Sequence, residues 1–285
     1  MRYLQHCFLY LSDARHHKYS YVPPMNLLIF IHSLHSGGAE RVAVNLANHW
    51  VQKGWRVTVV TLTRSAQDFY QLDHGAQRIA LDLAGHSTST LAAVRNNLLR
   101  VRALRQVLKQ VQPDVALAMM STANILLALA AIGLPGVAAV GSERTYPPRI
   151  PLGRVWEPLR AHLYGRLRAV VALTEESATW LHGHTKSRHI TVIPNAVAWP
   201  LPDQSPFLNA PVRIAGQLTL LAVGRLSEEK GFAELVKVFQ RLAPDFANWQ
   251  LIILGDGPGR IGLQAQIAAA GLSAQVKLSG RAGNV

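Results

Sequence analysis

Cysteine is almost absent from this chain of 285 residues, in which Cys7 is the only example. One cysteine cannot form an intrachain disulfide or supply a cysteine-based zinc site, which fits a reducing compartment. No apolar run reaches the roughly 18 residues that a membrane-spanning helix needs. The stretch from Cys7 to Leu11 is too short for a signal-peptide core. We therefore expect a cytoplasmic protein in which residues 1–24 form a disordered extension before the fold, with Met25 as an alternative start.

Acidic residues are also scarce, with 16 Asp and Glu against 29 Lys and Arg, a formal net charge of +13. This excess favours anionic partners such as nucleic acid, acidic lipid head groups or phosphorylated metabolites. No recognised nucleic-acid module occurs, so nucleic acid is not an expected partner. Two basic clusters interleaved with apolar residues suit an anionic membrane surface, although an apolar core with outward-reaching Arg explains them equally well. They comprise Arg95, Arg100, Arg102, Arg105 and Lys109, and then Arg149, Arg154, Arg160, Arg166 and Arg168 with Trp156, Leu159, Leu163 and Tyr164.

Short apolar runs alternate with helical patterns from Met25 onward. Strands that are apolar on both faces and separated by helices predict a parallel sheet covered on both sides, a doubly wound α/β domain over residues 25–198. One predicted helical stripe consists of Leu98, Val101, Leu104, Leu108 and Val111. Strands are predicted at Leu27–His32, Arg56–Leu62, Arg78–Leu83, Val115–Met119, Val137–Ser142, Ala169–Leu173 and Ile190–Ile193, with a helix at Ala39–Lys53 after the first.

A proline-rich stretch without periodicity, residues 199–216, predicts a linker. The alternation then restarts over residues 217–285. Three strands with two helices make half a Rossmann-like domain, so we expect one complete domain and an incomplete second one. The predicted strands are Leu218–Val223, Trp249–Leu254 and Val276–Leu278, and the helices are Phe232–Leu242 and Ile261–Ala270.

Three loops that follow strands could contact a ligand. Gly37 and Gly38 lie between a strand and a helix, where backbone N–H groups and the helix dipole favour phosphate, although such a pair is often only a tight turn. Arg225 and Lys230 lie in one loop with Gly224, where two cations could hold a diphosphate, although an ordinary polar loop is the alternative. This loop lacks the order of a Walker A sequence.

The third loop runs from Gly255 to Arg260. It resembles a dinucleotide fingerprint, but Arg260 occupies the position of the last glycine, and no acidic residue ends the next strand. A nicotinamide or flavin enzyme is therefore not expected. No cofactor is expected. The sequence also lacks an Asp-x-Asp motif.

Together, these loops resemble the family 4 retaining glycosyltransferases, which have the two-domain GT-B fold. Four segments carry the resemblance, which extends over residues 25–285: Gly37-Gly38-Ala39-Glu40-Arg41, Val192-Ile193-Pro194-Asn195-Ala196-Val197, Gly224-Arg225-Leu226 with Lys230-Gly231, and Gly255-Asp256-Gly257-Pro258. It implies a nucleotide diphosphate sugar, UDP-linked, as the substrate. Arg225 and Lys230 would neutralise its diphosphate without a metal ion, so no metal site is expected. The glycine loops and Pro258 would lie beside the nucleotide sugar.

The acceptor is inferred from a subset of the family that extends lipid-linked oligosaccharides or surface polysaccharides. Ser142-Glu143-Arg144 and a Ser-x-x-x-Asn stretch that contains Asn124 resemble this subset. Ser142, Glu143, Arg144 and Asn124 are therefore acceptor-side candidates for a glycan or a polyprenyl-diphosphate-linked acceptor. Where many relatives carry a His after the strand that ends near Met119, this chain has Met.

The family's acidic motif, two Glu separated by seven residues, has no counterpart here. The resemblance places it beyond residue 285, where it would hold the donor sugar and ribose. No catalytic residue is assigned. We expect weak or no transfer by this chain alone. The alternatives are a non-catalytic remnant, one half of a split enzyme, or an α/β module that binds a phosphorylated metabolite.

Overall fold

The structure, a computed structural model, describes residues 24–85, 89–196, 205–209 and 214–283. The predicted extension at residues 1–24 lies almost wholly outside these ranges, and so does much of the predicted linker at 199–216. The chain forms two compact units, which divide between residues 196 and 197.

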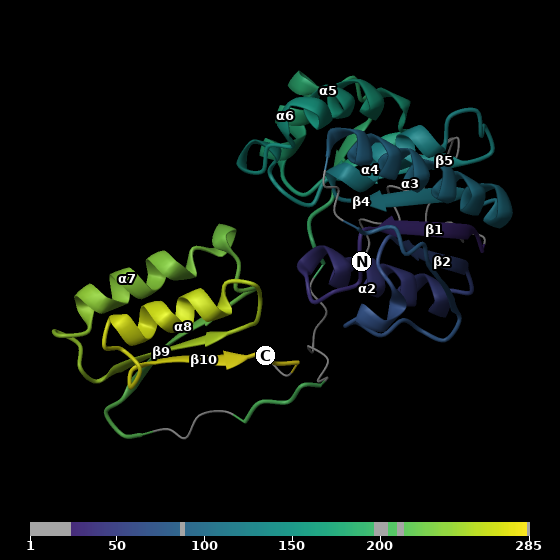
Figure 1. Ribbon diagram of the computed structural model, residues 1–285. Helices are drawn as coiled ribbons and strands as arrows, with labels where there is room; N and C mark the ends of the chain where they lie inside the picture. The colour runs from purple at the N-terminus through teal and green to yellow at the C-terminus, as the bar shows by residue number, and fades with distance from the viewer. Residues whose placement is uncertain (1–23, 86–88, 197–204, 210–213, 284–285) are drawn as a thin grey trace. The chain divides into compact units, whose positions relative to one another are not determined.

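The first unit is built on a seven-stranded parallel sheet with the strand order β3-β2-β1-β4-β5-β6-β7 (Figure 1). The order runs outward in both directions from the pair β1 and β4, which is the pattern of a doubly wound sheet. The predicted α/β class is therefore confirmed. The strands are β1 (Asn26–Ile31), β2 (Arg56–Thr61), β3 (Ala76–Ala80), β4 (Val115–Met119), β5 (Ala138–Ser142), β6 (Ala169–Ala172) and β7 (Ile190–Val192).

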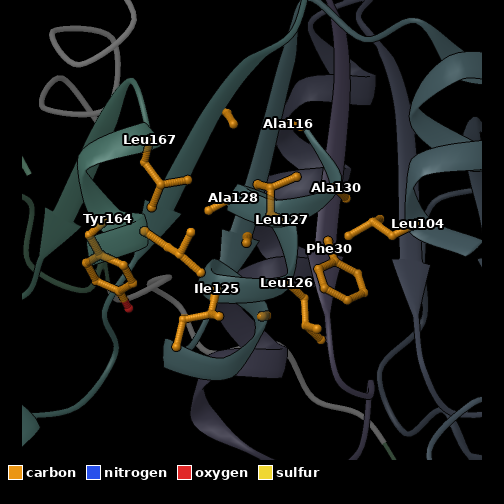
Figure 2. Close-up of a cluster of buried hydrophobic side chains, with 14 of the residues drawn as sticks. Phe30, Leu104, Ala116, Ile125, Leu126, Leu127, Ala128, Ala130, Tyr164 and Leu167 are labelled. Carbon is orange, nitrogen blue, oxygen red and sulfur yellow. The ribbon is translucent and has the colours of Figure 1, made fainter. Parts of the chain in front are cut away.

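Helices cover both faces of this sheet. Because successive strand residues point to opposite sides, each strand contributes side chains to two cores. Leu27, Ile29 and Ile31 of β1 pack with helix α2, whereas Leu28 and Phe30 pack into a second core with the helices of the opposite face. Figure 2 shows this second core, with α4 residues between Phe30 and Tyr164. The helices are α2 (Gly38–Gln52), α3 (Thr90–Val111), α4 (Ser121–Ala130), α5 (Gly153–Leu163) and α6 (Glu175–His184), with short 3-10 turns at Ser65–Gln67, Pro147–Arg149 and Tyr164–Arg166.

Strand β3 differs from the predicted strand at Arg78–Leu83. It pairs with β2 from Ala76 to Ala80 and then stops. Asp82 has a φ of +54°, a left-handed conformation that cannot continue a pleated strand. The segment beyond Ala80 therefore keeps only single backbone hydrogen bonds, from Leu81 to Thr61 and from Leu83 to Leu62, both 2.8 Å.

The second unit has a three-stranded parallel sheet in the order β10-β9-β8, with two helices whose apolar sides form its core. Within the described residues β8 is an edge strand, and Leu221 and Val223 on it are 54% and 56% exposed. The elements are β8 (Leu218–Val223), a 3-10 turn at Glu228–Lys230, α7 (Phe232–Leu242), β9 (Trp249–Leu254), α8 (Arg260–Ala269) and β10 (Val276–Gly280).

Candidate functional site

The first candidate region is the carboxyl edge of the seven-stranded sheet, where β1 and β4 meet. The chain leaves these two strands in opposite directions, and ligands of doubly wound sheets bind in the crevice that results. Two turns border this point: the glycine turn between β1 and α2, and the direct turn between β4 and α4.

The glycine turn is shaped around the carboxylate of Glu40. Gly37 is the N-cap residue of α2, and a Cβ at this position would lie 2.1 Å from Oε2 of Glu40. The hydroxyl of Ser33 donates to Oε1 of the same carboxylate over 3.4 Å. Gly38 has open space where a side chain would lie. A side chain at position 37 would therefore displace the Glu40 carboxylate, whereas Gly38 leaves room for an approaching molecule.

The turn between β4 and α4 contains Met120 in a strained conformation. Its φ of +83° and ψ of 152° are values that glycine adopts readily and other residues rarely do. The backbone N–H of Met120 donates to the carbonyl of Ser142 over 2.9 Å, which ties the turn to β5. The strain lies beside the β1–β4 switch point, where the resemblance expects His. The sequence gives no signal of this conformation.

Three of the four acceptor-side candidates lie beneath the surface. Asn124, Ser142 and Glu143 are 0%, 3% and 1% exposed. The Asn124 amide donates to the Tyr164 hydroxyl over 3.0 Å and accepts from the backbone of Ser142 over 3.1 Å. The Ser121 hydroxyl donates to Glu143 over 2.8 Å, and the Tyr164 hydroxyl also donates to Glu143. This network holds the ends of β4 and β5 together and offers a ligand no exposed side chain.

Burial sets the ionisation of the network. It raises the pKa of the Glu143 carboxyl, and the hydrogen bonds from Tyr164 and Ser121 oppose that shift. Burial also raises the pKa of the Tyr164 hydroxyl, and the Glu143 charge raises it further. Both groups are therefore held towards their neutral forms, which is the inexpensive state for buried polar groups.

Arg144, the fourth candidate, is half-buried at the end of β5. Its guanidinium donates to the side-chain amide oxygen of Asn195 and, over 3.4 Å, to the hydroxyl of Ser142. Its Nε is buried and has no hydrogen-bond partner within the described residues. Burial lowers the pKa of Arg144 to about 10. Arg144 is the candidate of this group that reaches the surface as a cation.

In the second unit, the predicted glycine loops after β8 and β9 pack against each other backbone to backbone. A Cβ on Gly255, whose φ is +145°, would lie 1.8 Å from the carbonyl oxygen of Gly224. A Cβ on Gly257 would lie 2.5 Å from the carbonyl oxygen of Leu226. Leu226 donates to the carbonyl of Asp256 over 3.1 Å. These glycines are required by the contact between the two loops, and Pro258 lies exposed at the tip of the second.

Arg225 and Lys230 extend from the first of these loops into solvent. In the part of the chain that the structure describes, neither forms an ion pair with a carboxylate. They flank Glu229, whose pKa is lowered mainly by a 2.6 Å hydrogen bond from Ser227 and further by the charges of Arg225 and Lys230. The loop therefore presents two exposed cations at the carboxyl end of β8.

The predicted basic surface is partly wrong. Arg160 is only 1% exposed, because it donates to Glu157 over 2.5 Å and its guanidinium lies 4.6 Å from the ring centroid of Trp180. Arg100 and Arg105 donate to backbone carbonyls, including Leu83 and Ala130. Leu98, a member of the predicted helical stripe, is 52% exposed. Arg95, Arg102 and Lys109 remain on the surface.

Within the described ranges, no set of three His, Cys, Asp or Glu side chains is grouped closely enough to hold a metal ion. Among the same residues, no helix combines the length and the apolar character needed to cross a bilayer.

Comparisons with known proteins match this chain to glycosyltransferases. Residues 36–198 match the family described as Glycosyltransferase Family 4, and residues 207–285 match Glycosyl transferases group 1. An uncharacterized glycosyltransferase of Haemophilus influenzae is 26% identical over 223 residues, which is 78% of this chain and 59% of that protein. The GalNAc-alpha-(1->4)-GalNAc-alpha-(1->3)-diNAcBac-PP-undecaprenol alpha-1,4-N-acetyl-D-galactosaminyltransferase of Campylobacter jejuni is 26% identical over 265 residues, 92% of this chain and 69% of that enzyme.

Solved structures show the same fold. Anabaena HepE in complex with UDP and glucose has a TM-score of 0.64 at 17% identity, over 90% of this chain and 69% of HepE. The sucrose-phosphate synthase of Thermosynechococcus elongatus has a TM-score of 0.69 at 14% identity, over 90% of this chain and 70% of that chain. At these identities the likeness supports the GT-B fold, and the chain spans about two thirds of the length of these neighbours.

Proposed function

The chain belongs to the family 4 glycosyltransferases, and from this premise we propose that it serves in sugar transfer from a nucleotide diphosphate sugar, UDP-linked, with retention of configuration. The transferred sugar is a hexose or an N-acetylhexosamine. The acceptor is a surface glycan or a polyprenyl-diphosphate-linked oligosaccharide. HepE binds UDP, which supports the donor half of the proposal, a UDP-linked sugar. The Campylobacter enzyme is named for a PP-undecaprenol substrate, which supports the acceptor half.

One observation carries the donor half: the loop after β8 presents two exposed cations without a carboxylate partner in the described residues. Arg225 offers a planar fork of donors and Lys230 a point charge, and both suit the oxygens of a diphosphate. Negative charge grows on the diphosphate as it leaves the sugar. Cations fixed in advance stabilise that charge more in the transition state than in the ground state.

The backbone contact between the two glycine loops gives these cations a fixed base. Gly255 and Gly257 bring the second loop against Gly224 and Leu226, so Arg225 extends from a packed turn. A fixed loop loses less conformational entropy when the nucleotide binds.

Calorimetry with UDP tests the donor half. Arg225→Ala should weaken binding by about 1.5–3 kcal/mol, the contribution of a hydrogen bond to a charged group. Arg241→Ala is the matched control. Arg241 is an exposed arginine in the last turn of α7, so its substitution removes the same charge from the same unit. Equal UDP affinity in the two variants would remove Arg225 from the donor site.

We also propose that the protein works at the cytoplasmic face of the plasma membrane as a peripheral protein. Helix α3 supports this, because it carries no acidic residue and exposes apolar side chains. Leu91 and Leu98 are 83% and 52% exposed. Arg95, Arg102 and Lys109 lie on the same face, since the steps of four, three, four and seven residues from Leu91 to Lys109 follow the helical repeat. A face of leucine and arginine suits an anionic bilayer.

Sedimentation with phospholipid vesicles tests this proposal. The chain should bind vesicles that contain phosphatidylglycerol and bind phosphatidylcholine vesicles far less. Replacing Arg95 and Arg102 with Gln should weaken binding by about 2 kcal/mol, at about 1 kcal/mol for each cation. Lys53→Gln with Arg56→Gln removes two exposed cations from another part of the unit and serves as the control. The proposal would be contradicted if the chain bound both kinds of vesicle equally well, or if the two double variants lost equal amounts of vesicle binding.

A further inference from the structure

Arg144 is a half-buried cation whose hydrogen-bond partners are all neutral. The structure gives it the amide oxygen of Asn195 and a long contact to the Ser142 hydroxyl. No carboxylate in the described residues forms an ion pair with it. Burial lowers its pKa, and no acidic neighbour contributes to that shift. An arginine that loses water without gaining a negative partner costs free energy, so a ligand that supplies the partner would bind with a gain.

The unpartnered Nε atom shows how a ligand would recover this cost. Nε is buried and makes no hydrogen bond to any residue that the structure describes, although an arginine has five N–H donors. A guanidinium that turned outward to an anion would free this donor and could present Nε and one terminal nitrogen side by side. Two parallel N–H groups match two oxygens of a phosphate. The contacts given up are the one to Asn195, a side chain on the surface, and the long one to the Ser142 hydroxyl.

The backbone beneath Arg144 is held firmly. The N–H of Glu143 donates to the carbonyl of Val171 over 2.8 Å, and the N–H of Ser142 donates to Asn124 over 3.1 Å. The carbonyl of Ser142 accepts from Met120 over 2.9 Å, which links this strand end to the strained turn at the switch point. The buried members of the Ser-Glu-Arg segment therefore fix the position from which Arg144 extends.

We infer that Arg144 binds a phosphate of the acceptor, so that the acceptor is a diphosphate-linked lipid and not a neutral glycan. This inference rests on the proposed function, because it assumes that the first unit holds the acceptor. The anion that Arg144 recognises is a phosphate or diphosphate group. Two molecules in the proposed reaction carry such a group, the nucleotide sugar and the lipid-linked acceptor. The experiment must therefore separate these two sources.

Calorimetry on the full chain with two probes makes that separation. UDP represents the donor, and farnesyl diphosphate represents a prenyl-diphosphate acceptor. Arg144→Gln should weaken farnesyl diphosphate binding by about tenfold or more, the effect of losing a charged hydrogen bond, and leave UDP binding within about twofold. Arg188→Gln is the matched control, because it removes an exposed arginine of the same unit that belongs to neither basic cluster. It should leave both affinities unchanged.

The other outcomes show whether Arg144 binds the donor, the acceptor or neither. A parallel loss of UDP affinity in Arg144→Gln would assign the anion to the donor and overturn the inference, and so would unchanged farnesyl diphosphate binding. If Arg225→Ala leaves UDP affinity unchanged while Arg144→Gln still loses farnesyl diphosphate, the proposed donor site is wrong and the phosphate site stands. Melting curves check folding, since loss of an unpaired half-buried cation should not lower the melting temperature. Arg144→Lys, which keeps the charge but loses the fork, should give an intermediate affinity.

Discussion

Gly255→Ala tests whether the loop contact in the second unit is as close as the structure indicates. The new Cβ would lie 1.8 Å from the carbonyl oxygen and 2.8 Å from the carbonyl carbon of Gly224, both backbone atoms that cannot rotate away. A φ of +145° is also a conformation that alanine rarely adopts, at a cost of about 1–3 kcal/mol. Adding the shift of one loop away from the other, we expect the second unit to lose about 2–4 kcal/mol of stability.

Gly262→Ala is the matched control, because it adds the same methyl group to a glycine in the helix that follows this loop. Gly262 lies inside α8 with nothing within 4 Å of its Cβ position. Alanine there should stabilise the helix by about 0.5–1 kcal/mol. The two variants are thus expected to move the stability of one unit in opposite directions.

Hydrogen exchange is the appropriate assay, since two compact units need not unfold together. Amides of β8 and β9 should exchange faster in Gly255→Ala and no faster in Gly262→Ala, while those of β1 and β4 stay unchanged. Calorimetry should also show weaker UDP binding in Gly255→Ala, because the displaced loop carries Arg225. Equal protection of β8 and β9 in the two variants would show that the loops do not touch as described.

Two further predictions concern the buried network of the first unit. Burial raises the pKa of Glu143 above its unfolded value, so its contribution to stability is full below about 4.5 and is lost as pH rises through the folded pKa. Chemical denaturation from pH 4 to 8 should therefore show the wild type losing stability relative to Glu143→Gln as pH rises, and a constant difference would contradict this. Tyr164→Phe leaves Glu143 and Asn124 each without one buried partner and should cost about 1–3 kcal/mol at pH 7 in the same assay. A loss below about 0.5 kcal/mol would mean that water replaces the hydroxyl.

The architecture of the first unit follows from short-range sequence patterns. The run Asn-Leu-Leu-Ile-Phe-Ile in β1 is apolar on both faces, and a strand with two apolar faces needs helices on both sides. The exception is instructive. The residues after Ala80 remain apolar in alternation, but the left-handed φ of Asp82 ends the strand early. Hydrophobic patterns do not record a single backbone torsion.

Burial of polar residues was harder to predict, because it depends on partners far away in the sequence. Arg160 reads as a surface arginine, yet it lies beside Trp180, twenty residues later, on another helix. Asn124 does carry a signal. It is the one amide in the helix Ser-Thr-Ala-Asn-Ile-Leu-Leu-Ala-Leu-Ala, whose other residues are small or apolar, and a lone amide in such a helix needs a buried partner. Its partner, Tyr164, could not be identified from spacing.

The segment Ser142-Glu143-Arg144 shows that neighbouring residues of one motif can differ sharply in burial. Glu143 points into the fold and is held towards its neutral form, whereas Arg144, the next residue, is half-exposed and charged. Glu143 therefore anchors the segment in the fold, and Arg144 reaches the surface, where we propose that it binds the acceptor phosphate. Substitution of Glu143 should therefore act on acceptor binding only through the position of Arg144, by disturbing the strand end. In Glu143→Ala, which removes the hydrogen bonds to Ser121 and Tyr164, farnesyl diphosphate affinity and unfolding free energy should fall together. Only Arg144 variants should lose affinity without losing stability.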